Sequence, residues 1–145
     1  MAESVIVEIL CVGNELLRGE IQDTNTNWIC RLVNSHGGQV ARATMLPDIE
    51  DEIAVAVRSA IERGVGVLFT SGGLGPTDDD LTLAAVAKGA GVTLELNVTA
   101  REMVRERYDD FSIQGVLAQG GLNPFREKMA WLPAGALPLQ NPVGT

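Results

Sequence analysis

The sequence predicts an α/β domain with a largely parallel sheet and helices on both of its faces. Short apolar segments alternate three times with amphipathic helical segments within roughly the first ninety residues, as in right-handed βαβ crossovers. The third apolar segment runs directly into a glycine-rich loop, and sheets of this class form ligand sites at the carboxyl ends of their strands. With 145 residues, the chain is long enough for one such domain and too short for two ordinary ones.

The first strand is predicted at Val5 to Val12, because this segment is mostly apolar and rich in β-branched residues. Gly13-Asn14-Glu15 follows and is the first loop that we expect to contribute to a ligand site. Asp23 or Thr24 can cap the helix that comes next. The apolar face of this helix comprises Trp28, Ile29, Leu32 and Val33. Capping alone would account for Asp23, Thr24 and Asn25, and ligand binding is the alternative.

The second strand is predicted at Gln39 to Leu46, and Pro47-Asp48 ends it. Asp48 is the expected N-cap of the following helix, because a carboxylate can accept a hydrogen bond from a free backbone N–H in the first turn. The expected buried stripe of that helix is Ile53, Val57, Ala60 and Ile61. Gly64 is expected to end it.

The third strand is predicted at Val65 to Thr70 and leads into Ser71, Gly72, Gly73, Leu74 and Gly75. Glycines allow the backbone to approach a ligand closely. A helix is predicted at Thr77 to Lys88, and Thr77 and Asp80 have the spacing of a capping box. The adjacent carboxylates Asp78, Asp79 and Asp80 repel one another, so they require solvent, hydrogen-bond donors or a cation. A solvated helix cap and a ligand site both satisfy that requirement.

The remaining sixty or so residues have weaker patterns. We expect an edge strand at Val92 to Leu96, and then a charged helix that begins with Thr99 and Glu102 at capping-box spacing and reaches about Asp110. Gly115 to Pro124 is expected to form a loop. Short strands are expected at Met129–Leu132 and Leu137–Leu139, followed by a turn from Asn141 to Thr145.

Two common phosphate-binding motifs are excluded. A P-loop needs a lysine followed by Ser or Thr after its last glycine, and Thr70 to Thr82 contains no lysine. Asp78 stands where a dinucleotide-binding fingerprint has its third glycine. The glycine-rich loop therefore belongs to another class.

Charge and composition exclude several further classes. The chain carries 11 basic and 19 acidic residues, a net charge of −8 without a basic run, so nucleic acid is not an expected partner. No signal peptide or membrane-spanning apolar segment is present, and we expect a cytoplasmic protein with no membrane partner. Cys11 and Cys30 are expected to be buried thiols in a reducing compartment. His36 is the only histidine, so a zinc site based on histidine is not expected.

Four segments resemble the molybdopterin-binding-domain superfamily of MoaB and Mog, and within it the N-terminal domain of CinA-type (competence/damage-inducible) proteins. They are VGNELLRGEIQDTNTNW, LPDIEDEI, TSGGLGPTDDDLT and NPFREKMAWLPAGALPLQNPVGT. The third is the most specific and matches the family pattern almost letter for letter. The resemblance covers nearly the whole chain and implies a three-layer α/β/α sandwich with a mostly parallel sheet.

The resemblance also implies a ligand and an activity. Domains of this type bind a pterin or a nucleotide-like pyrophosphate, and the functional aspartates of the Mog branch fall on Asp48 and Asp80. The CinA branch is associated with metal-dependent hydrolysis of ADP-ribose, often beside an amidase domain that a chain of this length cannot contain. Asp79 stands where Mog-type loops have a basic residue. The family usually continues beyond the position of Thr145, which indicates either a fragment or a minimal domain spanning 1–145.

We therefore expect a nucleotide pyrophosphatase that hydrolyses ADP-ribose with Mg²⁺ or a similar hard divalent metal. The alternatives are an enzyme of molybdenum-cofactor biosynthesis that binds or adenylylates molybdopterin, and a non-catalytic module that holds such a ligand. Asp48 and Asp80 are the expected catalytic residues, and Asp79 and Asp80 the expected metal ligands. The residues expected to bind the ligand are Gly13, Asn14, Glu15, Asp23, Thr24, Asn25, Thr70, Ser71, Gly72, Gly73, Gly75, Thr77, Thr82, Asn141 and Gly144. A homo-oligomer is expected, because superfamily members form dimers and trimers.

Overall fold

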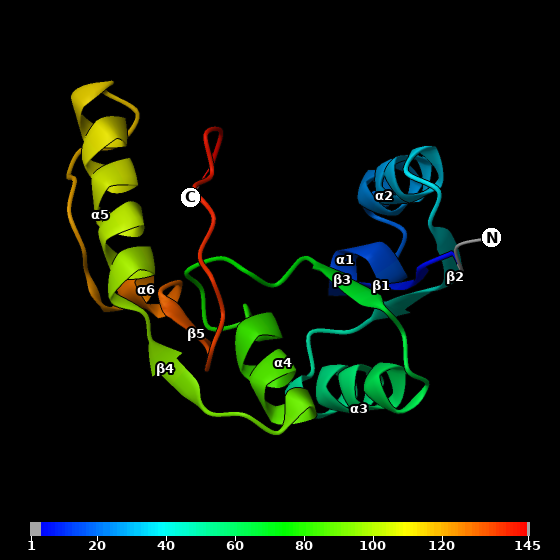
Figure 1. The fold of residues 1–145 in the computed structure, drawn as a ribbon. Coiled ribbons are helices and arrows are strands. Elements are labelled where there is room, and N and C mark those ends of the chain that lie inside the picture. The colour runs from blue at the N-terminus through cyan, green and yellow to red at the C-terminus, as the bar shows by residue number, and fades with distance from the viewer. Residues whose placement is uncertain (1–3, 145) are drawn as a thin grey trace.

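The computed structural model describes residues 4–144 and contains a parallel three-stranded sheet at its centre. The strands are β1 (Ile6–Val12), β2 (Gln39–Leu46) and β3 (Val67–Ser71), in the order β2-β1-β3. Helix α2 (Thr24–Ser35) connects β1 to β2, and α3 (Glu50–Glu62) connects β2 to β3 (Figure 1). A short helix, α1 (Asn14–Leu17), directly follows β1. The carboxyl ends of all three strands therefore lie at one edge of the sheet.

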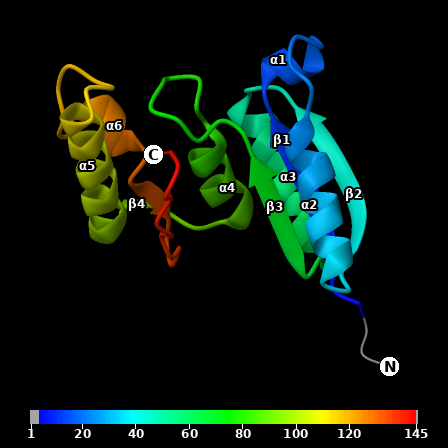
Figure 2. The ribbon, with the colours of Figure 1, turned by 90° about the horizontal axis from the view of Figure 1, so that it is seen from above.

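The sheet is the middle of three layers, which confirms the predicted sandwich. On one face, Val7 and Ile9 of β1 pack with Ile29 and Val33 of α2. On the opposite face, residues of β1 pack against α3 and against α4 (Thr82–Ala90). These residues are Leu10, Val12, Ile53, Val57 and Ala85. Figure 1 shows α2 and α3 on opposite sides of the strands, and Figure 2 views the same layers from above.

A second group of elements lies on the far side of α4 from the sheet in both ribbon views (Figures 1 and 2). It contains α5 (Val98–Ile113), α6 (Pro124–Lys128) and an antiparallel pair of strands, β4 (Leu94–Leu96) and β5 (Trp131–Pro133). Ala130, which is fully buried, accepts a hydrogen bond from the N–H of Asn97 at 2.9 Å and so joins the end of α6 to the start of α5. No helix within residues 4–144 is long and apolar enough to cross a membrane.

One charged side chain is buried within the sheet. Glu8 of β1 is only 3% exposed, and its carboxylate accepts hydrogen bonds from Nε and Nη2 of Arg63 at 2.7 and 2.6 Å. Arg42 lies 3.8 Å away on β2. The hydrogen-bonded Arg63 guanidinium lowers the pKa of Glu8 against the opposing effect of burial. The pair fixes the carboxyl end of α3 to the central strand.

Two predicted N-caps were wrong. Ile49, not Asp48, occupies the N-cap position of α3, and no side chain caps that helix. The Asp48 carboxylate instead accepts a hydrogen bond from the N–H of Asn14. Asn97, not Thr99, caps α5, and its side chain accepts from the N–H of Ala100 at 2.9 Å. Asn is at least as effective an N-cap as Thr, so the earlier residue determines the helix start.

The helix after the glycine-rich loop begins later than predicted, at Thr82 rather than Thr77. Thr77 to Asp80 instead forms a turn, in which the Asp80 N–H donates to the Thr77 carbonyl at 3.2 Å. Only half of the predicted capping box is present. The Asp80 carboxylate accepts a hydrogen bond from the Thr77 N–H, as a capping box requires. The Thr77 hydroxyl, however, donates to the same carboxylate rather than accepting from a backbone N–H. Positive φ angles at Gly72 and Gly73 direct the chain away from a helical path before this turn.

Other differences concern surface positions and short elements. Ile61 and Trp28 are 54% and 63% exposed, so both were wrongly assigned to buried faces. The segment 137–139 is not a strand. Helix α6 falls at the end of a predicted loop, although Asn123 caps it and Pro124 stands in its first turn. An Asn-Pro pair at these positions is a recognisable helix start.

Candidate functional site

The loops that follow β1 and β2 are joined at the carboxyl edge of the sheet. The Gly13 N–H donates to the Leu46 carbonyl at 3.0 Å, which extends the β1–β2 pairing by one bond. The next N–H, that of Asn14, donates to Oδ2 of Asp48 at 2.8 Å. Asp48 therefore lies beside the first loop, in the arrangement expected for a shared site. The Glu15 carboxylate lies over Gly13, where it would contact an added Cβ.

The third loop is joined to the first by the start of α2. Nδ2 of Asn25 donates to Oγ of Ser71 at 2.8 Å. Asn25 and its neighbour Thr24 are exposed in the first turn of α2, and Ser71 is the last residue of β3. The structure thus brings together predicted site residues that are 46 positions apart in sequence.

Asp23 caps α2, which was one of the two roles predicted for it. Its carboxylate accepts the Thr26 N–H at 3.0 Å and also a hydrogen bond from the Thr26 hydroxyl. Sγ of the buried Cys11 lies 2.7 Å from the same hydroxyl oxygen. Burial acts to raise the pKa of Asp23, but the hydrogen bonds from Thr26 together hold it below its ordinary value. Asp23 therefore fixes the start of α2 to β1.

The glycine-rich loop has a shape that only glycine allows at two positions. Gly72 has φ +89°, and a Cβ there would lie 2.0 Å from the Val12 carbonyl oxygen. Gly73 has φ +62°, and a Cβ there would lie 2.4 Å from Oγ1 of Thr82. Both glycines are therefore required for packing, whatever they contribute to a ligand. At Gly75 the nearest obstacle is Oδ2 of the Asp80 side chain, at 2.7 Å.

Thr82 holds this loop from within the core. Its side chain is 0% exposed, and its hydroxyl donates to the Gly72 carbonyl at 2.8 Å. Its N–H donates to the Gly73 carbonyl at 3.1 Å. Thr82 thus maintains the shape of the loop. The N–H groups of Gly73 and Leu74 have no hydrogen-bond partner among residues 4–144, so both can donate to an anion.

Asp80 is the half-buried member of the three adjacent aspartates, and Asp78 and Asp79 are exposed. Oδ2 of Asp80 accepts from N and Oγ1 of Thr77 at 2.9 and 2.6 Å. Burial acts to raise the pKa of Asp80, but the Thr77 hydrogen bonds and the charge of Lys128 bring it below its ordinary value. Asp80 is therefore a fixed, ionised carboxylate at neutral pH.

The donor set limits how a metal could bind. Within residues 4–144, no three His, Cys, Asp or Glu side chains lie together as a ready-made metal site. Mg²⁺ is usually held by one or two carboxylates together with the phosphates of a substrate. The carboxylates of Asp79 and Asp80 fit a hard divalent ion bound in that way.

A groove of about 1030 Å³ runs beside β3. Thr70 and Leu74 line it from the strand and the loop, and Asn141 and Gly144 line it from the other side. Arg107 of α5 holds the C-terminal segment, because its guanidinium donates to the carbonyls of Pro142, Val143 and Gly144 at 2.9 to 3.3 Å. Asn141 and Gly144 therefore share this groove with Thr70 rather than joining Asp48 and Asn14.

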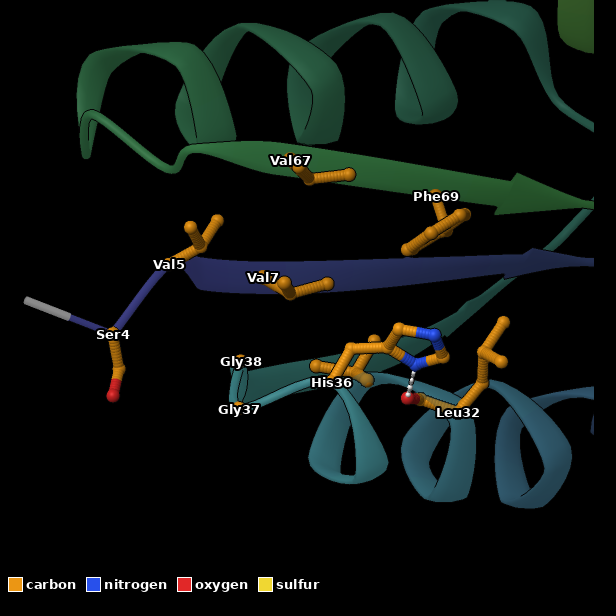
Figure 3. Close-up of a pocket in the computed structure, with 10 residues that line it drawn as sticks. Ser4, Val5, Val7, Leu32, His36, Gly37, Gly38, Val67 and Phe69 are labelled. Atoms are coloured by element: carbon orange, nitrogen blue, oxygen red, sulfur yellow. Dashed lines mark hydrogen bonds between the residues drawn. The ribbon is translucent and has the colours of Figure 1, made fainter. Parts of the chain in front are cut away.

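A second cavity, of about 550 Å³, lies at the opposite end of the sheet (Figure 3). Its lining is mainly apolar, from Val7, Leu32, Val67 and Phe69. The imidazole of His36 borders it, with Nδ1 donating to the Leu32 carbonyl at 2.8 Å. None of the predicted site residues lines this cavity, so it is separate from the loops at the carboxyl edge.

Comparisons with known proteins identify the family to which this domain belongs. Residues 8–142 match a family described as "Probable molybdopterin binding domain". The chain belongs to this molybdopterin-binding domain family. A crystal structure of CinA from Thermoplasma acidophilum, described as of unknown function, has a TM-score of 0.84 at 38% identity and covers 97% of this chain and 77% of that one. The molybdopterin biosynthesis enzyme MoaB from Thermus thermophilus has a TM-score of 0.56 at 27% identity, with coverages of 70% and 63%.

Similar proteins from two further organisms are longer than this chain. A protein of Pyrobaculum arsenaticum is 45% identical over 137 residues, which are 94% of this chain and 49% of that protein. A protein of Saccharolobus solfataricus is 44% identical over 94% of this chain and 48% of its own length. The chain spans about half the length of these curated relatives.

Two basic residues at the loops of this family domain were missed from the sequence. Arg107 stands in a helix with many charges, and nothing in its spacing distinguishes it. Lys128 donates a hydrogen bond to the Thr77 carbonyl and lines a small cavity with Gly73, Gly75 and Asp80. It lies in the fourth of the segments that resemble the CinA-type domain, but nothing within that segment showed that its side chain would reach the glycine-rich loop.

Proposed function

We propose that this molybdopterin-binding-type domain binds an ADP-ribose-like dinucleotide at its glycine-rich loop and hydrolyses the pyrophosphate with a divalent metal. The observation that carries the proposal is the joining of the three loops through Asn14–Asp48 and Asn25–Ser71, which gathers carboxylates and a loop with unpaired N–H groups at one edge of the sheet. Free N–H groups favour a phosphate. Carboxylates favour a phosphate that arrives with a cation.

In the proposed reaction, water adds across the P–O–P bridge to give AMP and ribose 5-phosphate. The N–H groups of Gly73 and Leu74 would donate to phosphate oxygens, and Asp79 and Asp80 would hold the metal. A bound divalent ion neutralises phosphate charge and lowers the pKa of water. The Asp48 carboxylate, fixed by Asn14, would orient the attacking water and accept its proton.

Molybdopterin binding or adenylylation is the second candidate. The family description and the similarity to MoaB favour it. Asp79 opposes adenylylation in particular, because an ATP triphosphate would bring more negative charge to a loop that already carries three carboxylates. A non-catalytic module holding either ligand would have the same loops.

A direct assay separates these candidates. The protein is incubated with ADP-ribose, or with molybdopterin and ATP, each with and without MgCl₂, and the products are followed by ³¹P NMR. The proposal expects metal-dependent AMP and ribose 5-phosphate from ADP-ribose. Adenylylated molybdopterin would support the second candidate, and ligand binding without turnover would support a binding module.

A further inference from the structure

Lys128 lies at the glycine-rich loop although it comes from the opposite part of the molecule. It is the last residue of α6, and its ammonium donates a hydrogen bond to the Thr77 carbonyl. With Gly73, Gly75 and Asp80 it lines a cavity of about 110 Å³. The loop therefore has a cation against it that its own segment, residues 70–82, does not contain.

The position of Lys128 is fixed by several contacts on α6. Arg126 stacks over the ring of Tyr108 at 4.1 Å, and Glu127 accepts a hydrogen bond from Arg101 at 2.6 Å. Asn123 caps the helix. These contacts join α6 to α5, so the lysine is presented to the loop by a constrained helix rather than by a free tail. Such support is what holds a binding group in place before its ligand arrives.

The ammonium also has donors to spare. A lysine carries three N–H bonds, and Lys128 makes one hydrogen bond among the described residues. Among the described residues it forms no ion pair, although its charge acts on the nearby Asp80 carboxylate. Two N–H bonds remain for another acceptor. The free N–H groups of Gly73 and Leu74, which line the same small cavity as Lys128, suit the same kind of acceptor.

We propose that Lys128 is a ligand-binding residue whose ammonium contacts a phosphate oxygen of the pyrophosphate bound at the glycine-rich loop. This inference rests on the proposed function and adds a fixed positive charge to a site otherwise rich in carboxylates. A phosphate oxygen would then be shared between Lys128 and the loop N–H groups, while the metal meets the aspartates. A contact of this kind makes the site selective for phosphorylated ligands over uncharged ones of similar shape.

The test is isothermal titration calorimetry with ADP-ribose and MgCl₂, and separately with inorganic pyrophosphate. Lys128→Gln can still donate a hydrogen bond to the Thr77 carbonyl, but it removes the charge. We expect its affinity to fall by about 10- to 100-fold, in line with the loss of one charge-assisted hydrogen bond. Lys128→Arg should retain most of the affinity. Lys88→Gln is the matched control, because it makes the same charge change on α4, where Lys88 pairs with Glu50 and Asp51.

The dependence on salt distinguishes a charge contact from a structural link between α6 and the loop. If Lys128 contacts phosphate, the difference between the parent and Lys128→Gln should shrink as KCl is raised, because salt screens the contact. A difference that does not change with KCl would overturn the proposal in favour of a purely structural role. Equal affinity of parent and Lys128→Gln would overturn it as well. If the parent binds neither probe, with or without metal, the proposed function fails and this inference fails with it.

Discussion

Asp80 could either shape the turn after the glycine-rich loop or bind the metal, and its hydrogen bonds allow the two roles to be tested separately. Thr77 donates two hydrogen bonds to a single carboxylate oxygen, Oδ2. Asp80→Asn can retain both bonds through its amide oxygen, so the structural loss should be on the order of 1 kcal/mol or less. What the change removes is the negative charge.

We therefore expect Asp80→Asn to reduce turnover of ADP-ribose by about 100-fold or more, because charge dominates binding of a hard cation. Its unfolding free energy without metal should change little, or rise as repulsion with Asp78 and Asp79 is relieved. Steady-state kinetics and urea denaturation measure the two effects. Asp78→Asn is the control, since Asp78 is exposed and the same charge is removed. An Asp80→Asn protein with near-parent turnover would show that Asp80 only shapes the turn.

Glu8 gives a prediction about pH. Its pKa is lowered in the folded state by Arg63, so its contribution to stability is present above its ordinary value of 4.5 and is lost as pH falls through the lower, folded value. The unfolding free energy should decrease between about pH 5 and pH 3. Glu8→Gln should be less stable than the parent at pH 7, by about 1–3 kcal/mol, and should have a weaker dependence on pH in this range. Parallel denaturation curves for the two proteins across that range would contradict the assignment.

At the scale of elements, the junction between β3, the glycine-rich loop and α4 depends on one buried hydroxyl. Thr82→Val would remove the donor to the Gly72 carbonyl and leave that oxygen without its partner inside the core. We expect a loss of about 1–3 kcal/mol in unfolding free energy, together with weaker ligand binding as the loop loses its shape. Thr82→Ser keeps the hydroxyl and should bind ligand nearly as well as the parent. Equal affinity of the Val and Ser variants would contradict this role.

The strands and crossover helices were predictable because their apolar periodicity reflects burial on both faces of a parallel sheet. Helix starts were harder to predict, because several polar residues near each start could act as the cap. Thr77 and Asp80 have capping spacing, yet they form a turn because the positive φ angles at Gly72 and Gly73 set the direction of the chain. The convergence of Asn25 on Ser71 followed from the topology. The approach of Lys128 to the glycine-rich loop did not follow from the sheet topology, because Lys128 lies on α6, outside the sheet and its crossover helices, and contacts Thr77 from 51 positions away.

At the scale of the whole molecule, the surface beside β3 combines an unpaired strand edge with exposed apolar side chains. Within residues 4–144, β3 pairs only with β1, so its other edge has no strand partner. Nearby, in the segment that borders the groove, Leu137 and Leu139 are 87% and 89% exposed, and Val143 is 83% exposed. An unpaired strand edge beside exposed apolar side chains favours association with another polypeptide.

We therefore expect this chain to self-associate at micromolar concentration. The net charge of −8 opposes association, and salt screens that repulsion, so the mass measured by light scattering should rise with protein concentration and with NaCl. Leu139→Asp places a further negative charge on the exposed segment and should shift the equilibrium toward the single chain. Ile113→Asp is the matched control, because Ile113 is 84% exposed at the end of α5 and does not line the groove. A constant mass of 15.4 kDa across concentration and salt would exclude self-association, and equal shifts from both variants would place the interface elsewhere.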